Sequence, residues 1–284
     1  MTSELKLSLA HTLKHSTASV YNSGLKVVLQ TFGKAPIKKL GRYEIELFLA
    51  SKSKTYAKNT LREFRASLSR LMSWAVSNDW IEKNPVSGIK LPAGTGNEIT
   101  RNVLSSKQVN ALAAKLDEPY ATLILFLAAT GLRVGEAIGI KWTDFDGEVL
   151  NVQRRIYDGV IDTVKTESAK RSIPIPTRLL KRLEGRERVS EWVFNSRSGT
   201  PLNPGNALRR YIQPTAQGLG IALSGFHDLR HSLATDLINS GVSAKAVSQI
   251  LGHANVGITL NTYTHPATKD FAGPLTERAG QFVM

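Results

Sequence analysis

The sequence predicts a mainly α-helical protein of two domains, in which a small antiparallel β-sheet is confined to the second domain. Three observations support this prediction. The 284 residues are enough for two domains that each bury a hydrophobic core. Apolar residues recur at three- and four-residue spacing in several segments, which is typical of amphipathic helices. Alternating patterns, which are typical of strands, are confined to about residues 149–175.

Three helices are predicted in the first domain. The first is expected over about residues 17–31 and is ended by Gly33 and Pro36. The second is expected over residues 43–50. The third begins near Thr55 and is the clearest, because its apolar residues recur at helical spacing. They are Leu61, Phe64, Leu68, Leu71, Met72 and Ala75.

The face of the third helix between these apolar residues carries four cations, which are Lys58, Arg62, Arg65 and Arg70. Charge on a helix usually marks a face in contact with solvent. Few acidic residues accompany these four, however, and such a row of cations also suits the phosphates of a nucleic acid. We therefore predict that the four cations contact nucleic acid.

A linker separates the two domains. Asn84-Pro85 ends the helical region, and the Pro- and Gly-rich segment over residues 91–97 indicates a connection without regular structure. Helices then return: Ser105 or Ser106 is a suitable N-cap for the next one. A mostly apolar helix follows over residues 120–129 and ends at Gly131.

Strand patterns interrupt the helices of the second domain. Residues 149–153 and 171–175 are predicted as strands, and Asp158-Gly159 is predicted as a turn between them. From Pro204 onward the pattern is helical again. The predicted division of the chain is therefore a first domain at 1–92, a linker at 93–103, a second domain at 104–264 and a tail at 265–284.

The net charge of +14 and the isoelectric point of about 10.0 are typical of a nucleic-acid-binding protein. A basic surface that serves only solubility has the same composition. The distribution of charge favours binding, because residues 1–95 hold 15 Lys and Arg against 6 Asp and Glu, a balance of +9 that leaves +5 for the other 189 residues. The first domain is expected to clamp a polyanion.

Composition also excludes several classes of protein. The absence of cysteine excludes disulfides, thiolate catalysis and Cys-ligated zinc. No run of eighteen apolar residues is present, and the N-terminus lacks the pattern of a signal peptide, so we expect a cytoplasmic protein without a membrane span. The sequence contains no acidic cluster that would suggest a metal site, and no phosphate-binding loop that would suggest a nucleotide cofactor.

The second domain contains residues that suit chemistry on a phosphodiester. His227 and Arg230 are three apart and would share a helix face. His253 follows a predicted helix end at Gly252, and Tyr263 lies ten residues later. Arg133 follows the helix end at Gly131. Each residue alone has an ordinary structural explanation, such as packing or capping. Together they supply a nucleophile, cations that neutralise oxygen charge, and imidazoles that move protons.

The order of these motifs resembles the tyrosine recombinase (phage integrase) family. The motifs are Thr-Gly-Leu-Arg-x-Gly-Glu ending at Glu136, a hairpin lysine, His-x-x-Arg, Leu-Gly-His and then the tyrosine. The resemblance covers about residues 104–264, and residues 55–92 resemble more loosely the core-binding domain of the family. It implies an all-α, SAM-like DNA-clamping domain followed by a helical catalytic domain.

The resemblance implies a role for each matching residue. Tyr263 would attack the scissile phosphate and form a 3′-phosphotyrosyl bond. Arg133 and Arg230 would donate to the non-bridging oxygens, since a guanidinium can form two parallel hydrogen bonds. His253 would donate to the same phosphate. His227 would accept the phenol proton, because an imidazole titrates near neutrality.

Lys165 matches the hairpin lysine of the family, which is the general acid for the 5′-oxygen. Lys170 and Arg171 remain alternatives, because the register of the hairpin cannot be read from the sequence. Glu136, three residues after Arg133, would orient that arginine, although an ordinary surface pair has the same spacing. We expect structural roles for His231 and Asp228.

The resemblance also implies the partners. Four subunits would pair two double-stranded DNA sites with specific core sequences and exchange strands through a Holliday junction, with accessory DNA-bending proteins as possible partners. No metal or cofactor is implied. We expect a recombinase of a phage or mobile element, without an additional DNA-binding module before the first domain, and a tail that packs on a neighbouring subunit. The alternatives are a Xer-like resolvase, a topoisomerase-like relaxase and a DNA-binding protein that no longer cuts.

Overall fold

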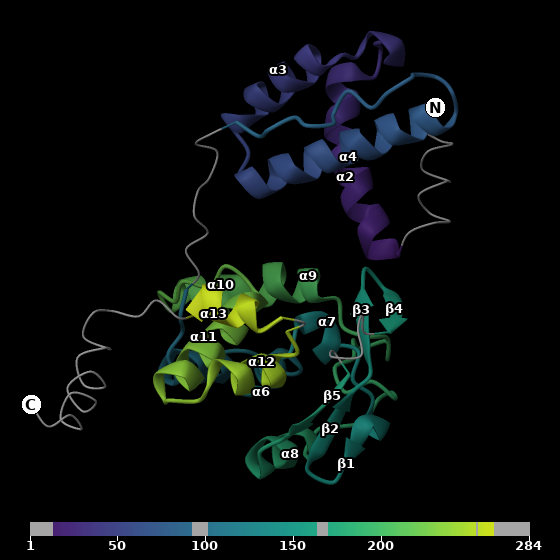
Figure 1. The fold of residues 1–284 in the computed structure, drawn as a ribbon. Coiled ribbons are helices and arrows are strands. Elements are labelled where there is room, and N and C mark those ends of the chain that lie inside the picture. Colours follow the sequence, from purple (N-terminus) through teal and green to yellow (C-terminus); the bar gives the residue numbers. More distant parts are fainter. Residues whose placement is uncertain (1–13, 93–101, 164–169, 254, 264–284) are drawn as a thin grey trace, which may run out of the picture. The chain divides into compact units, whose positions relative to one another are not determined.

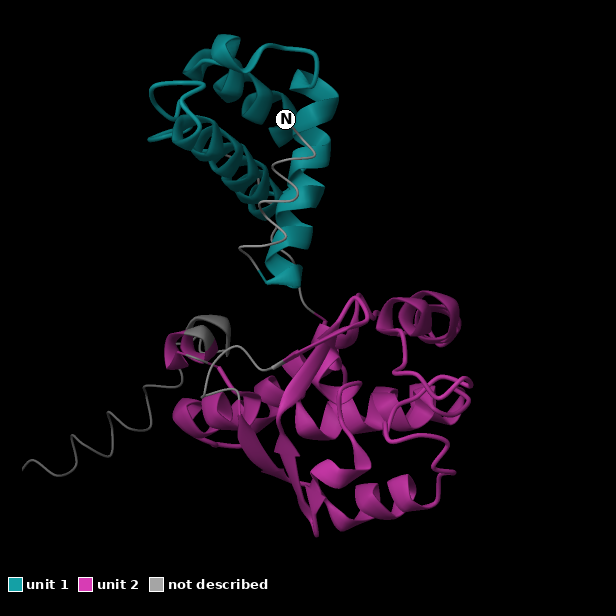
Figure 2. Cartoon of the chain, turned by 90° about the vertical axis from the view of Figure 1, so that its right-hand side faces the viewer, with its two compact units in different colours: residues 1–100 teal, residues 101–284 magenta. Residues whose placement is uncertain are grey.

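The computed structural model describes residues 14–92, 102–163, 170–253 and 255–263. The chain forms two compact units, residues 1–100 and residues 101–284, which Figure 2 shows in different colours. The regular secondary structure in the described part of unit 1 is helical, and the described strands all belong to unit 2. The predicted fold class, mainly α-helical with antiparallel strands confined to the second part, is confirmed.

Unit 1 contains the helices α2 (His15–Phe32), α3 (Arg42–Ser53) and α4 (Lys58–Ser77) and the short turn η1 (Ile37–Lys39). Helices α2 and α4 pack against each other (Figure 1). They approach so closely at Gly24 that a Cβ atom there would overlap the hydroxyl of Ser67. All six apolar residues predicted for the core side of α4 are buried, because helical spacing places them on one face.

The start of α4 differs from the prediction. The helix begins at Lys58 rather than near Thr55. The backbone amides of Thr55 and Tyr56 both donate to the carbonyl of Lys52, so these residues complete the turn that ends α3. The ring of Tyr56 then packs edge-on against Phe64, with 5.0 Å between ring centres. This contact comes from packing between separate turns of the chain, which a capping pattern does not reveal.

Unit 2 is built around helix α6 (Tyr120–Thr130), which packs against α5 (Ser106–Ala114), α8 (Thr177–Glu184) and α11 (Phe226–Asn239). Ser105 is the N-cap of α5, since its hydroxyl accepts from the amide of Gln108. The remaining helical elements are α7 (Val134–Ala137), η2 (Trp142–Asp144), α9 (Pro204–Ala207), η4 (Leu208–Ile212), α10 (Gln213–Gly218), α12 (Ala244–Leu251) and α13 (Val256–Tyr263).

Within the described ranges, the strands form two small antiparallel sheets rather than one. The strands β1 (Phe145–Asp146), β2 (Val149–Val152) and β5 (Arg171–Pro174) lie side by side in that order (Figure 1). The strands β3 (Arg154–Tyr157) and β4 (Val160–Thr163) form a separate hairpin. Its two turn residues are the predicted Asp158 and Gly159, with φ values of 50° and 75°. Two consecutive residues with positive φ match the twist of a tight hairpin.

The core of unit 2 places the ends of two helices beside each other. Four residues of α6 contribute to this core: Leu123, Ile124, Phe126 and Leu127. Helix α6 ends at Gly131, where a Cβ atom would lie only 2.6 Å from Cδ2 of Leu251, at the end of α12. The loops that follow the two helices therefore start from neighbouring points. None of the helices in the described ranges is both long and apolar enough to cross a membrane.

Candidate active site

Two helices end at glycines in the left-handed region, as the sequence predicts. Gly131 ends α6 with φ of 63°, and Gly252 ends α12 with φ of 65°. Residues with a Cβ atom rarely adopt this conformation, whereas glycine adopts it at little cost. The chain can therefore turn sharply after each helix. Arg133 lies just after the turn that ends α6, and His253 lies just after the turn that ends α12.

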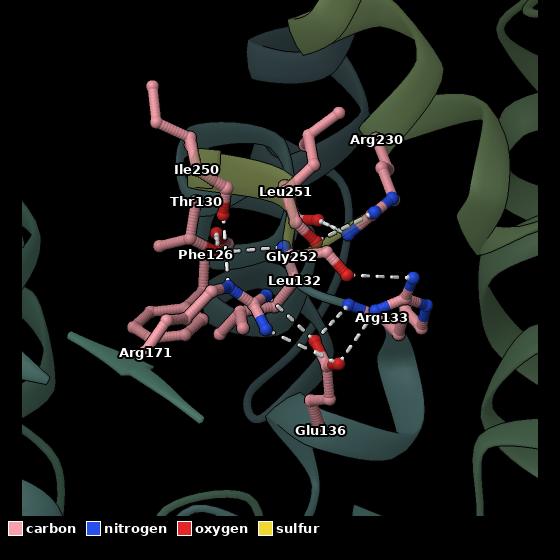
Figure 3. A network of polar contacts seen from close by, with 11 residues as sticks. Phe126, Thr130, Leu132, Arg133, Glu136, Arg171, Arg230, Ile250, Leu251 and Gly252 are labelled. Carbon is pink, nitrogen blue, oxygen red and sulfur yellow. Dashed lines mark hydrogen bonds and ion pairs between the residues drawn. The ribbon is translucent and has the colours of Figure 1, made fainter. Parts of the chain in front are cut away.

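Three arginines bind three successive carbonyls at the end of α12 (Figure 3). The bonds are Arg171 Nε to Ile250 at 3.0 Å, Arg230 Nη2 to Leu251 at 2.8 Å and Arg133 Nη2 to Gly252 at 3.4 Å. Carbonyls in the last turn of a helix lack partners within the helix and carry its negative partial charge. The end of α12 therefore holds three cations together that come from distant parts of the sequence.

Arg230 is the most deeply buried of the three, with a residue exposure of 2%. Its Nη1 donates to the carbonyl of Gly131 at 2.7 Å, in addition to the bond with Leu251. The guanidinium thus links α11 to the ends of both α6 and α12. A buried charge is costly unless hydrogen bonds compensate it, and these two carbonyls provide strong ones.

Glu136 is the buried acid of the site. Its carboxylate accepts from the backbone amide of Arg133 at 3.0 Å, from Arg133 Nη1 at 2.9 Å and from Arg171 Nη2 at 2.9 Å. Figure 3 shows it between the two guanidinium groups. Burial alone would raise the pKa of Glu136, but the hydrogen bond from Arg171 and the charges of Arg171 and Arg133 outweigh it and lower this pKa. The carboxylate is ionised and holds both arginines.

The contact between Glu136 and Arg133 is the one expected from the sequence, whereas the contact between Glu136 and Arg171 was not expected. Sequence reasoning considered Arg171 only as an alternative to Lys165. Its contacts with Glu136 and Ile250 cross 35 and 79 residues of sequence, so no local spacing could reveal them. The one available signal was a cation at the start of a predicted strand.

His253 is half-buried in the loop after α12. Its Nδ1 lies 2.8 Å from Oγ1 of Thr259, on helix α13. Burial lowers the pKa of His253 to about 4, and the charges of Arg230, Arg133, His227 and Arg171 add to this shift. The imidazole is therefore neutral near pH 7. The side chain of Asn255 accepts from the amide of Gly257 at 2.7 Å and caps α13.

The structure describes some of the other predicted site residues fully, some in part and some not at all. His227 is exposed in the first turn of α11, near enough to His253 to affect its pKa. Asp228 is buried and accepts from the amide of Ser224 at 2.7 Å, which is a structural contact. Tyr263 is the last described residue of α13, and its side chain lies outside the description. Lys165 falls in 164–169, outside the described residues, whereas Lys170 is exposed.

The four cations predicted to contact nucleic acid lie on α4. Lys58, Arg62 and Arg70 are exposed. Arg65 is partly buried, and its Nη1 donates to the carbonyl of Ile89 at 2.8 Å. Arg65 therefore braces the segment after α4. Within the part of the chain that the structure describes, no three His, Asp or Glu side chains gather into a group that could hold a metal ion.

Comparisons with known proteins identify the family of this chain. Residues 102–270 match the sequence pattern of the phage integrase family. The chain is 31% identical over 266 residues to a tyrosine recombinase XerC-like protein of Caldanaerobacter subterraneus subsp. tengcongensis, and the match covers 80% of this chain and 66% of that protein. The chain spans 60% to 66% of the length of several curated relatives that it matches.

Solved structures share the fold. The Tn1549 transposon integrase in complex with a circular intermediate DNA superposes with a TM-score of 0.77 at 22% identity, covering 96% of this chain and 98% of that one. A lambda integrase tetramer bound to a Holliday junction gives 0.72 at 20% identity, covering 93% and 76%. Because the family pattern spans more than half of the sequence, this chain belongs to the phage integrase family.

Proposed function

We propose that the chain is a site-specific DNA recombinase that cuts and rejoins DNA strands through a phosphotyrosyl intermediate. The observation that carries this proposal is the group of cations at the ends of α6 and α12. There Arg133 and Arg230 are held by carbonyls and a buried carboxylate, beside a neutral His253. Cations fixed in place before the substrate binds suit the transition state of phosphoryl transfer, in which charge spreads over the non-bridging oxygens.

In the proposed reaction, the hydroxyl oxygen of Tyr263 attacks the phosphorus of the scissile phosphodiester. A bond forms between the tyrosine oxygen and phosphorus, and the bond to the 5′-oxygen breaks. His227 accepts the phenol proton, and Lys165 gives a proton to the 5′-oxygen as it leaves. Arg133, Arg230 and His253 donate hydrogen bonds to the non-bridging oxygens.

The reverse attack by a 5′-hydroxyl of a partner strand would reseal the DNA. The phosphotyrosyl bond conserves the energy of the broken bond, so the proposal needs no nucleotide cofactor. Glu136 holds Arg133 in this scheme through the two hydrogen bonds that it accepts from that residue. The same carboxylate holds Arg171.

Double-stranded DNA is the proposed substrate. We assign residues 1–92 to a DNA-clamping domain, 93–103 to a linker, 104–264 to the catalytic domain and 265–284 to a tail. The balance of +9 in residues 1–95 supports the clamp. The proposal also includes specific core sites and a homotetramer that passes through a Holliday junction. It further includes accessory DNA-bending proteins and a cytoplasmic, nucleoid-associated location. An origin in a phage or mobile element is supported by the likeness to a transposase of Tn916.

A covalent-trapping experiment tests the proposal. The full chain is incubated with nicked duplexes from its own element, and phosphotyrosyl complexes are detected as DNA-linked bands on denaturing gels. We expect such complexes for the wild type and none for Tyr263→Phe, which lacks only the hydroxyl and should bind DNA as the wild type does. Tyr211→Phe is the control and should still form complexes. Complexes that persist in Tyr263→Phe and vanish in Tyr211→Phe would show that the nucleophile is another tyrosine.

A further inference from the structure

Thr259 is a fully buried residue that the reaction scheme does not use. Its exposed fraction is 0%, and it lies on α13, one helical turn before Tyr263. Its hydroxyl oxygen is 2.8 Å from Nδ1 of His253. This contact joins the loop after α12 to the helix that carries Tyr263.

The burial of the Thr259 hydroxyl indicates which partner donates the proton. A hydroxyl buried away from water must donate its proton to an acceptor to avoid a desolvation penalty. Three other threonines in the helices of unit 2 donate to the carbonyl four residues earlier: Thr130 to Phe126, Thr215 to Tyr211 and Thr235 to His231. Thr259 makes no such bond, and the imidazole of His253 is its one hydrogen-bond partner among the described residues.

The hydroxyl of Thr259 therefore donates, and Nδ1 of His253 accepts with its lone pair. A neutral imidazole has one N–H and one lone pair, so a lone pair at Nδ1 places the proton on Nε2. Burial and the surrounding cations keep the ring neutral near pH 7. The choice between the two neutral forms then decides whether Nε2 is a hydrogen-bond donor or an acceptor.

We propose that Thr259 is a positioning residue that holds neutral His253 as the Nε2–H tautomer, so that Nε2 donates a hydrogen bond to an oxygen of the phosphate attacked by Tyr263. This inference rests on the proposed function for its role in cleavage. The tautomer itself is a property of the protein without DNA. An acceptor at Nε2 would repel the oxygen that the arginines attract, so fixing the tautomer favours the transition state.

Two substitutions separate the hydroxyl from the shape of the side chain. Thr259→Val replaces the hydroxyl with a methyl group of similar size, and Thr259→Ser keeps the hydroxyl. The ¹⁵N chemical shifts of both ring nitrogens of His253 are measured near pH 7 in the DNA-free full chain. We expect a protonated Nε2 and an unprotonated Nδ1 in the wild type and in Thr259→Ser. Thr259→Val should contain a mixture of both tautomers.

Single-turnover cleavage of nicked DNA provides the second measurement. Thr259→Val should cleave about twofold more slowly at unchanged DNA affinity, since the loss of one buried hydrogen bond shifts the tautomer equilibrium by about tenfold and turns a predominant Nε2–H form into a mixture. Thr259→Ser should retain most of the rate. Thr215→Val, which removes a threonine hydroxyl that bonds only a backbone carbonyl, is the matched control and should change neither the tautomer of His253 nor the rate.

The outcomes that overturn the proposal are distinct from those that overturn the proposed function. A protonated Nδ1 in the wild type, or an unchanged tautomer in Thr259→Val, would show that Thr259 does not select the tautomer. A changed tautomer with an unchanged cleavage rate would show that the selection has no role in cleavage. A wild type with the expected tautomer that forms no covalent complex would instead refute the recombinase activity and leave the tautomer assignment standing.

Discussion

Arg171 and Glu136 form a buried ion pair, in which Nη2 lies 2.9 Å from Oε2 and the side chains are 8% and 3% exposed. The same guanidinium donates from Nε to the carbonyl of Ile250. One side chain from strand β5 therefore supports both the acid that holds Arg133 and the helix end that precedes His253. Arg171 therefore supports the proposed roles of Arg133 and His253, although it is not assigned a chemical step itself.

Arg171→Met should therefore destabilise the protein strongly. Removing one partner of a buried pair costs about 3–5 kcal/mol when it leaves a charge uncompensated, and the bonds that Glu136 keeps with Arg133 place the expected loss toward the lower end of this range. We expect a loss of that order in the free energy of unfolding, measured by urea denaturation and followed with a probe in unit 2. The comparison is Arg155→Met, which breaks a less buried pair with Asp162, at 23% and 25% exposure. A loss of about 1 kcal/mol is expected there.

A double-mutant cycle identifies the cause. The loss in Arg171→Met combined with Glu136→Gln should be smaller than the sum of the two single losses, because the neutral amide no longer needs a cation. Additive losses would show that Arg171 acts through packing or through Ile250 rather than through Glu136.

Gly252→Ala should disturb the site more than its backbone conformation alone explains. A Cβ atom at Gly252 would lie 2.7 Å from Nη1 and 3.0 Å from Cζ of Arg171. Gly241 is the matched control, since it has φ of 85° and nothing within 4 Å of an added Cβ atom. Gly241→Ala should cost about 1–2 kcal/mol of unfolding free energy from left-handed strain alone. Gly252→Ala should cost more and abolish covalent complex formation. Equal effects of the two substitutions would mean that Arg171 moves aside without consequence.

The local features of the site could be predicted from the sequence, and the long-range ones could not. Glycine after an apolar helix predicts the left-handed ends at Gly131 and Gly252, and a three-residue spacing predicts the pair of Arg133 and Glu136. Each pattern lies within a few residues, where helix geometry fixes distances. The contacts of Arg171 depend on where β5 lies beside α12, which is decided by packing of the whole unit.

The same distinction explains the differences in the fold. The turn of the β3–β4 hairpin is predicted from Asp158 and Gly159, whereas its two strands are not. The separation of this hairpin from the sheet of β1, β2 and β5 depends on pairing between distant strands. Arg65 matches its three neighbours in sequence pattern. Only the tertiary structure shows that it braces Ile89, because that carbonyl lies 24 residues away.

Arg65 and Arg62 should therefore differ in their effects on DNA binding. Arg62 is exposed on α4, so Arg62→Ala should reduce the slope of log affinity against log salt by about 0.9, the contribution of one phosphate contact. Arg65→Ala should lower the stability of unit 1, with a smaller change in the slope, because its guanidinium is engaged by Ile89. Filter-binding titrations across salt concentrations measure the slopes. Equal slope changes would place both side chains on phosphates.

The low pKa of His253 predicts how stability depends on pH. The folded chain protonates His253 near pH 4, whereas the ordinary value is 6.5. Between these values the unfolded chain binds a proton that the folded chain does not, so stability should fall as pH drops through this window. Glu136 loses its own contribution only below its ordinary value of 4.5. His253→Gln should therefore flatten the profile between pH 6.5 and 4.5.

An NMR titration of His253 tests the cause of this shift. Arg133→Gln removes one of the charges that lower the pKa of His253, so the midpoint should rise from about 4 and remain below 6.5, because burial is the larger cause. Arg188→Gln is the control, since Arg188 stacks on Trp142 and should leave the midpoint unchanged. A midpoint near 6.5 in the wild type would contradict the burial of the ring.

Lys165 is the residue for which a chemical substitution in the DNA is the sharpest test. An alkoxide leaves poorly unless it is protonated as the bond breaks, and an ammonium group can supply that proton. Lys165→Ala should therefore bind normal DNA but cleave it very slowly. Sulfur in place of the bridging 5′-oxygen makes a leaving group that needs no proton, so this variant should cleave the modified DNA.

Arg133→Ala should not be rescued, since its proposed task is to neutralise the non-bridging oxygens. Arg171 is already engaged by Glu136 and Ile250, and an arginine does not release its proton in proteins, so Arg171→Ala should not be rescued either. Rescue of Lys170→Ala instead of Lys165→Ala would identify Lys170 as the acid.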